Sequence, residues 1–295
     1  MPTFLQICCA NLARIIGAAL LAAALAGCST LKLAYNNLPE FGYWWLDSYL
    51  DFDGSQTPRV RDELDRLLAW HRRNELPQWI AIVQKAQALA PQDVTPEQAC
   101  ELGEALRSRL LALTERAEPA AAELALSLSP AQLDQLQRKY TRLNAEYRSD
   151  WLSKSAEAQQ TKRYERWLDR SEDFYGSLDT AQRRTLRRMV AESIFSASLF
   201  DAERKRRQGV VLATLRGLTA EPNMPASEAQ RAVHAYVRSV AEPPAGRWRE
   251  QQQALWQEGC RNFATLHNMT TTAQREQAVR RLHSYEVELR ELSAQ

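Results

Sequence analysis

One local pattern recurs along this chain and restricts its fold more than any other feature. A Ser, Thr or Asp is followed three residues later by Gln at six places: Asp53…Gln56, Thr95…Gln98, Ser129…Gln132, Asp179…Gln182, Ser227…Gln230 and Thr271…Gln274. Each pair is typical of a capping box, in which the first side chain accepts from a backbone N–H of the first helical turn and the Gln bonds back. The pattern therefore predicts six helix starts.

Apolar residues follow these starts at helical spacing. One run contains Leu133, Leu136, Tyr140, Leu143, Tyr147 and Trp151. Each such stripe needs another helix to cover it. Glycine is scarce, and Ala, Leu, Arg, Glu and Gln are abundant, which favours helix almost everywhere. We predict an all-α fold, an elongated bundle of long helical hairpins.

Prolines and polar segments divide this predicted bundle. We expect helix breaks at Pro77, Pro91, Pro119, Pro222, Pro225 and Pro243-Pro244. The polar stretch Ser153–Lys162 favours a bend or an exposed bridge. A turn cluster at residues 221–225 leaves two alternatives open: a sub-boundary near residue 220, or further helices that complete the same bundle.

The N-terminal segment has the features of a bacterial lipoprotein signal. Residues 1–27 contain one base, Arg14, and no acid, and an apolar run from Ile15 leads to Leu25-Ala26-Gly27-Cys28. That run is too short to span a bilayer but suits a signal-peptide core. The final four residues form a lipobox, so we expect cleavage before Cys28 and acylation of its sulfur.

This signal predicts where the mature protein resides. Ser29 follows Cys28, and mainly Asp at that position would retain a lipoprotein in the inner membrane. We therefore predict the periplasmic face of the outer membrane, with lipid as the anchor. The expected organisation is a signal peptide at 1–27, an anchor and tether at 28–36, and a helical domain at 37–295.

Charge and cysteine content limit the partners and the redox state. The whole chain has 38 bases and 36 acids, so no net field would capture nucleic acid. Cys100 and Cys260 are the two cysteines after Cys28. In an oxidising periplasm they could pair, or they could be two buried thiols, since free cysteine is often buried.

An aromatic block comes between the lipobox and the first helix start. It consists of Tyr35, Phe41, Tyr43, Trp44, Trp45, Tyr49 and Phe52. Trp and Tyr favour the headgroup zone, so this block could contact lipid. Aromatic residues at helical spacing usually belong to a core, and we expect this block to pack into the bundle.

The segment Trp70–Pro77 is the most distinctive short run. On a helix His71 and Glu75 share a face, with Arg72 beside them, so a carboxylate could orient the imidazole. The alternatives are a polar acid–base site and a local ion pair beside a proline. We favour the ion pair, because no third partner is visible to complete a catalytic set.

Other motifs do not indicate a cofactor or a metal. His234, His267 and His283 lack zinc-ligand spacing, and no phosphate loop, dinucleotide fingerprint or nucleophile elbow occurs. Two basic runs, at 183–188 and 204–207, could meet anionic headgroups. We expect both runs on one helix as a solvated face, because acids are interspersed.

Two resemblances follow from these motifs. The lipobox, Tyr35-Asn36, Trp45-Leu46-Asp47, Gln56 and the Trp70–Pro77 run resemble an uncharacterised family of proteobacterial putative lipoproteins, a domain of unknown function. That resemblance implies an all-helical lipoprotein and no known activity. The Leu128–Gln132 helix start is similar to those of small periplasmic chaperones of the Spy type.

Three functional hypotheses remain. The first is a non-enzymatic outer-membrane lipoprotein that binds another envelope protein or folds around an envelope component. The second is a Spy-like chaperone that holds unfolded chains on an apolar face. The third is an enzyme that uses the region of His71 and Glu75. An exposed apolar patch favours the first two, and a deep polar pocket around His71 favours the third.

Overall fold

The computed structural model describes residues 32–221 and 223–295, and every regular element in those ranges is helical. The α-helices are α2 (Leu38–Leu50), α3 (Gln56–Trp70), α4 (Leu76–Leu89), α5 (Pro96–Leu126), α6 (Pro130–Tyr147), α7 (Ala156–Tyr175), α8 (Thr180–Glu192), α9 (Ala197–Ala220), α10 (Ala226–Ala241), α11 (Arg247–Asn268) and α12 (Thr272–Ser293). The all-α prediction is confirmed. The signal segment and Cys28 lie outside the described residues.

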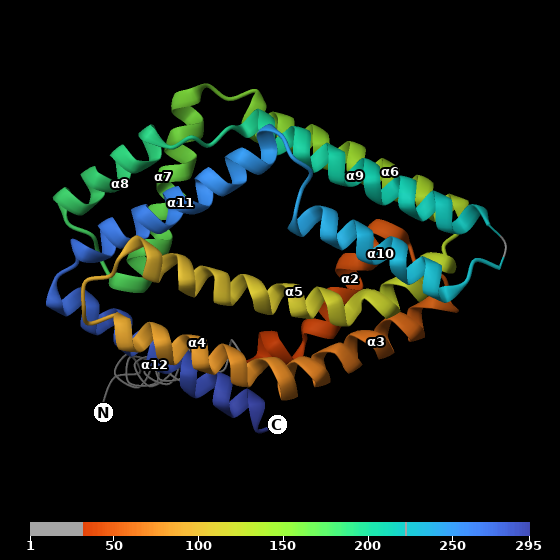
Figure 1. The fold of residues 1–295 in the computed structure, drawn as a ribbon, viewed down its shortest axis with the longest axis horizontal. Helices are drawn as coiled ribbons and strands as arrows, with labels where there is room; N and C mark the ends of the chain where they lie inside the picture. The colour runs from red at the N-terminus through yellow and green to blue at the C-terminus, as the bar shows by residue number, and fades with distance from the viewer. Residues whose placement is uncertain (1–31, 222) are drawn as a thin grey trace, which may run out of the picture.

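The helices form an elongated, flattened assembly of hairpins (Figure 1). Helix α12 packs along α4, α10 and α11 pack along α5, and α6 pairs with α9. The core consists of several small clusters; one joins Leu50, Leu128, Leu133 and Leu136, and another joins Tyr175, Leu178, Leu186, Leu266 and Ala278. Within the described part of the chain, no helix is both long and apolar enough to cross a membrane.

Four of the predicted capping boxes begin helices with both hydrogen bonds in place. They start α5, α6, α8 and α12 at Thr95, Ser129, Asp179 and Thr271. Asp53 and Gln56 exchange the same two bonds, although the α-helix itself starts at Gln56. The box at Ser227 is wrong. Helix α10 already begins at Ala226, because Pro225 precedes it and its carbonyl accepts from the first turn.

Capping boxes meet in pairs, and their Gln amides link distant parts of the chain. Gln56 Nε2 donates to the Ser127 carbonyl at 2.8 Å, and Gln132 Nε2 donates to the Asp51 carbonyl at 3.1 Å. Gln132 Nε2 also donates to Gln56 Oε1 at 2.6 Å. Each Gln therefore caps its own helix with Oε1 and holds the other box with Nε2.

A second junction repeats this arrangement. Gln182 Nε2 donates to the Met269 carbonyl at 2.9 Å, and Gln274 Nε2 donates to the Ser177 carbonyl at 3.0 Å. In both junctions the accepting carbonyl lies two residues before the capping residue of the partner box. Figure 1 places the two junctions at opposite ends of the long axis, so matching crosslinks close both ends of the bundle.

Helix breaks occur at most of the predicted prolines and in the polar segment, with two exceptions. Pro77 lies in the first turn of α4, which follows the π-helical segment 71–75 without a gap, so the break predicted at Pro77 is wrong. The chain bends at residues 153–155, between α6 and α7. Pro119 lies inside α5, so the break predicted there is wrong. A proline removes one helical hydrogen bond. Helix α5 tolerates the loss because α9, α10 and α11 pack along it.

The helices after residue 220 pack on the same framework as those before it. Ala229 of α10 shares a core cluster with Ala122 and Ala125 of α5 and Leu218 of α9. A disulfide between Cys100 and Cys260 joins α5 to α11, with the two Cα atoms 5.3 Å apart. Gly103 lies one turn from Cys100, and a Cβ there would meet the Trp256 ring at 2.7 Å, which explains the close approach of these helices.

Candidate functional site

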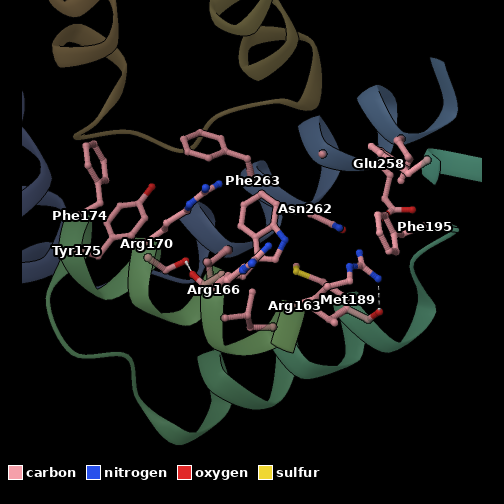
Figure 2. Close-up of a pocket in the computed structure, with 18 of the residues that line it drawn as sticks. Arg163, Arg166, Arg170, Phe174, Tyr175, Met189, Phe195, Glu258, Asn262 and Phe263 are labelled. Carbon is pink, nitrogen blue, oxygen red and sulfur yellow. Dashed lines mark hydrogen bonds between the residues drawn. The ribbon is translucent and has the colours of Figure 1, made fainter. Parts of the chain in front are cut away.

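A cavity of about 760 Å³ lies between α7, α8 and α11 (Figure 2). Its lining is rich in aromatic and aliphatic side chains, with three arginines from α7 among them. A volume in this range is typical of sites that enclose a small organic ligand. The cavity is therefore the candidate functional site.

Helix α7 supplies one wall through a regular spacing. Arg163, Arg166, Trp167, Arg170 and Phe174 recur every three or four residues, so they share one face of the helix. The other face of α7 carries acids. The N-cap of α7 is Ser155, whose side chain accepts from Ala158 N–H, and this cap fixes the start of the helix just after the bend.

Helices α8 and α11 supply the apolar floor. Leu186, Met189, Val190 and Leu266 are buried beneath the cavity. Phe263 also lines it but is 42% exposed, and Trp167 on the opposite wall is 44% exposed. Two large ring systems thus present apolar surface to the cavity without a protein side chain covering them.

One end of the cavity is closed by a buried polar relay. His267 Nε2 lies 2.8 Å from the Gln92 carbonyl, which can only accept, so Nε2 carries the proton. The Tyr175 hydroxyl then donates to Nδ1 at 2.9 Å. Burial lowers the pKa of His267 and raises the pKa of Tyr175, so both groups stay neutral. This relay fixes α7 and α11 to the loop before α5.

The three arginines differ in their partners. Arg163 donates to Ser193 Oγ at 2.7 Å, stacks over the Phe195 ring at 4.5 Å and feels the charge of Glu258. Arg166 lies over the Trp151 ring at 5.3 Å, and Arg170 is exposed. Within the described residues, neither Arg166 nor Arg170 has a carboxylate partner. Figure 2 shows both side chains at the cavity.

The polar groups at the cavity are suited to binding rather than to acid–base chemistry. Ser171 Oγ donates to the Trp167 carbonyl of its own helix, so the hydroxyl is engaged there. Glu258 accepts from the Ile194 backbone N–H at 3.0 Å. No set of three His, Cys, Asp or Glu side chains in the described ranges could hold a metal ion. What remains available is a pair of cations beside an apolar chamber.

The predicted polar site at His71 lies elsewhere and has a different character. Residues 71–75 form a π-helical segment between α3 and α4, an irregularity that is common near functional sites. His71 Nδ1 lies 2.8 Å from the Tyr35 hydroxyl, and Arg72 donates to Asn36 Oδ1 at 2.7 Å. The segment therefore binds residues 35 and 36, near the start of the described chain.

Glu75 does not hydrogen-bond to His71, although its charge acts on the imidazole. It is 4% exposed and faces Arg109 of α5 at 3.7 Å. Burial lowers the pKa of His71 by more than the neighbouring Glu75 charge raises it. Together with buried Leu76 and Leu292, these contacts form the His71 cluster, which joins the N-terminal segment to α4 and α12.

The aromatic block is split between core and surface. Tyr35 and Tyr43 are buried, in agreement with the expected packing. Phe41, Trp44 and Trp45 are each exposed by 58% or more, so the expectation that the whole block packs into the bundle is wrong for these three residues. They lie on the outer face of α2, because Tyr43 and Leu50 already occupy its inner face.

The basic runs also differ from expectation. The run at 183–188 lies on α8 and the run at 204–207 lies on α9, so they are not on one helix. Buried Asp201 and Glu203 pair with Arg204, Lys205, Arg206 and Arg207 within α9. All four bases of the second run therefore pair within their own helix, although the two acids offset only part of the positive charge.

Sequence reasoning missed the arginines of α7. They are spread over a heptad as Arg163, Arg166 and Arg170, so they do not stand out as a run. A helical-face reading of residues 163–174 would have found them, because cations and aromatic residues alternate on that single face.

A comparison with protein-family models identifies the family of the chain. The model of a family of unknown function, DUF6279, matches residues 48–224. The chain belongs to this family. The match includes α7, α8 and the His71 segment, and it begins after the predicted lipobox. No curated protein and no solved structure matches the chain.

Proposed function

We propose that this DUF6279 protein is a non-enzymatic binding protein anchored by lipid at the periplasmic face of the outer membrane. Cys28 would carry the lipid, and the helical domain would bind an envelope component. The observation that carries the proposal is the exposed apolar face of α2, a helix that begins ten residues after Cys28. This face consists of Leu38, Phe41, Trp44 and Trp45.

The position of this face supports a bilayer as its contact. Three residues lie between Cys28 and Lys32, where the described chain that leads into α2 begins. A fully extended chain spans at most about 3.5 Å per residue, so this end of the domain stays near the anchor. Trp and Phe side chains are stable at the headgroup boundary. Tyr35 and its bond to His71 hold this end of the chain on the domain, so the domain itself would face the membrane in one orientation.

The polar interior supports binding over catalysis. His71 contacts Tyr35, His267 joins Tyr175 to Gln92, and His234 pairs with buried Glu118 at 2.9 Å. Each of these three imidazoles therefore has a partner on a second structural element. The two histidines with lowered pKa values are held neutral by burial. These are the contacts of residues that fix helices to one another.

The anchor is tested in cells. Cys28→Ala should leave an unprocessed precursor that takes up no labelled palmitate. Maturation of this variant together with outer-membrane fractionation would contradict the lipoprotein assignment.

The α2 face is tested with the chain from Ser29, which retains every described helix. It should sediment with vesicles of equal parts phosphatidylethanolamine and phosphatidylglycerol. Trp45→Glu should weaken sedimentation about tenfold, since burying one large apolar side chain is worth roughly 1.5–3 kcal/mol. Leu110→Glu is the matched control, because Leu110 is 54% exposed on α5, compared with 61% for Trp45. Equal effects of the two substitutions would exclude α2 as the contact surface.

A further inference from the structure

We propose that the cavity between α7, α8 and α11 binds an anionic amphiphile with a single alkyl chain, with its head group at Arg166 and Arg170. This inference rests on the proposed function in that it assigns a ligand class to a binding protein. It is carried by two features of the cavity, an open apolar chamber and two cations without carboxylate partners.

The chamber suits an alkyl chain. Its floor of Leu186, Met189, Val190 and Leu266 offers no hydrogen-bonding side chain. Binding becomes more favourable when an alkyl chain covers these apolar side chains and removes their surface from water. Gly259 also lines the cavity, and a Cβ at this position would meet no atom within 4 Å. The glycine therefore leaves space that a ligand can fill.

The cations suit an anionic head group at one side of the chamber. Arg166 and Arg170 are one helical turn apart on α7, so their guanidinium groups can approach one anion together. Phosphate and carboxylate both match the arginine fork. Glu258 lies at the other side of the cavity, where its charge acts on Arg163, so an anionic head group is favoured at Arg166 and Arg170.

The arrangement favours an amphiphile over an unfolded polypeptide. A holdase surface needs to accept many sequences and therefore gains little from a fixed pair of cations. Here the apolar rings of Trp167 and Phe263 lie across one chamber of limited volume, with the cations beside it. A ligand with one chain and one charge uses both features at once.

The test is calorimetric titration of the chain from Ser29 with four probes below their micellar concentrations. Dodecyl phosphate and dodecanoate should both bind, and their ratio distinguishes a phosphate from a carboxylate head group. Dodecyltrimethylammonium should bind about tenfold more weakly or worse, since it lacks charge-assisted hydrogen bonds to arginine. Inorganic phosphate should not bind in the same range, because the chamber would remain empty.

Charge reversal tests the head-group site. Arg166→Glu with Arg170→Glu should weaken dodecyl phosphate binding by about tenfold or more. The control is Arg184→Glu with Arg188→Glu, a pair at the same spacing on the exposed face of α8 and outside the cavity lining. Equal losses of affinity in the two double variants would mean that the change in net charge alone weakens binding. That result would overturn the head-group assignment.

A cavity-filling variant tests the chamber without threatening the fold. Gly259→Leu should abolish dodecyl phosphate binding and leave stability unchanged or higher, since glycine is less favourable inside a helix than leucine. Gly209→Leu in α9 is the control, because a Cβ there also meets no atom. Unchanged binding by Gly259→Leu would place the ligand outside the cavity and overturn the proposal.

Failure of this inference is distinguishable from failure of the proposed function. The titrations need no anchor, so dodecyl phosphate binding by the chain from Ser29 would still support the cavity if Cys28→Ala matured normally and the lipoprotein assignment failed. Conversely, a lipid-anchored protein that binds a denatured apolar polypeptide and none of the amphiphiles would act as a holdase, and the amphiphile proposal would be wrong.

Discussion

The His71 cluster and the α7 cavity contain similar residues but use them in opposite ways. In the His71 cluster, His71 meets Tyr35, Arg72 meets Asn36, and Glu75 faces Arg109. In the cavity, Arg166 and Arg170 lack a carboxylate partner among the described residues, and Trp167 and Phe263 stay exposed. Paired polar groups stabilise a junction between segments. Cations left without a protein acceptor beside open apolar surface are available to a ligand.

Removal of the disulfide should give the largest change in stability, and it should affect the two regions unequally. The bond closes a loop with a sequence separation of 160, for which the chain-entropy model gives up to about 5 kcal/mol. Cys260 follows Gly259, which lines the cavity, whereas His71 lies in a different part of the fold. Cys100→Ser with Cys260→Ser should therefore lower the free energy of unfolding and reduce amide-exchange protection more in α11 than at residues 71–76. Two free thiols under non-reducing denaturing conditions would contradict this expectation.

Truncation of one apolar side chain in each region should separate stability from binding. Leu76 is 1% exposed, so Leu76→Ala should cost about 2–5 kcal/mol of folding free energy. Phe263 is 42% exposed, so Phe263→Ala should cost about 0.5 kcal/mol or less and weaken dodecyl phosphate binding instead. Thermal melts and titrations measure both quantities. The contrast fails if Phe263→Ala destabilises the fold as much as Leu76→Ala does.

The helix starts were predictable from the sequence because capping is a local interaction. Thr95, Ser129, Asp179 and Thr271 need only a Gln three residues later to form a box. The pairing of boxes was not predictable. It depends on which helix ends meet in space, and nothing local distinguishes Gln182, which is buried against Gln274, from Gln98, which caps Thr95 alone.

The cavity was missed for a related reason. Runs of like charge are conspicuous in a sequence, yet each base of the run at 204–207 pairs with Asp201 or Glu203 of its own helix. The arginines of α7 matter because the chain bends at 153–155 and α7 then packs on α8 and lies across the cavity from α11. A bend angle depends on packing, and propensity alone does not define it. The exposed face of α2 was likewise hidden among aromatic residues that do enter the core.

The paired boxes permit a matched comparison of one motif in two environments. Gln182 is 1% exposed, and its removal leaves the Met269 carbonyl and Gln274 without their partner. Gln182→Ala should therefore cost about 1–3 kcal/mol. Gln98→Ala, in the unpaired box, should cost about 1 kcal/mol or less. Denaturant unfolding measures both, and equal costs would mean that the amide crosslinks contribute nothing beyond capping.

The smallest expected effect concerns His71 itself. His71→Ala removes a single hydrogen bond to Tyr35, and such bonds contribute about 0.5–1.5 kcal/mol. Tyr35→Phe is the control, since it removes the same bond and keeps the aromatic ring. Both should lower the melting temperature by similar small amounts, and neither should change dodecyl phosphate binding. Loss of that binding in His71→Ala at unchanged stability would move the functional site from the cavity to His71.

The pH dependence of the same variant sharpens this last comparison. Burial lowers the pKa of folded His71 below its ordinary value of 6.5, so the folded protein favours neutral imidazole. The unfolded chain takes up a proton as pH falls below 6.5, and the folded protein resists until its lower pKa is reached. Stability from His71 is therefore present above pH 6.5 and is lost in the acid range. The difference in unfolding free energy between the wild-type protein and His71→Ala should shrink from pH 7.5 to pH 5, and a growing difference would mean that a charged His71 is what the cluster stabilises.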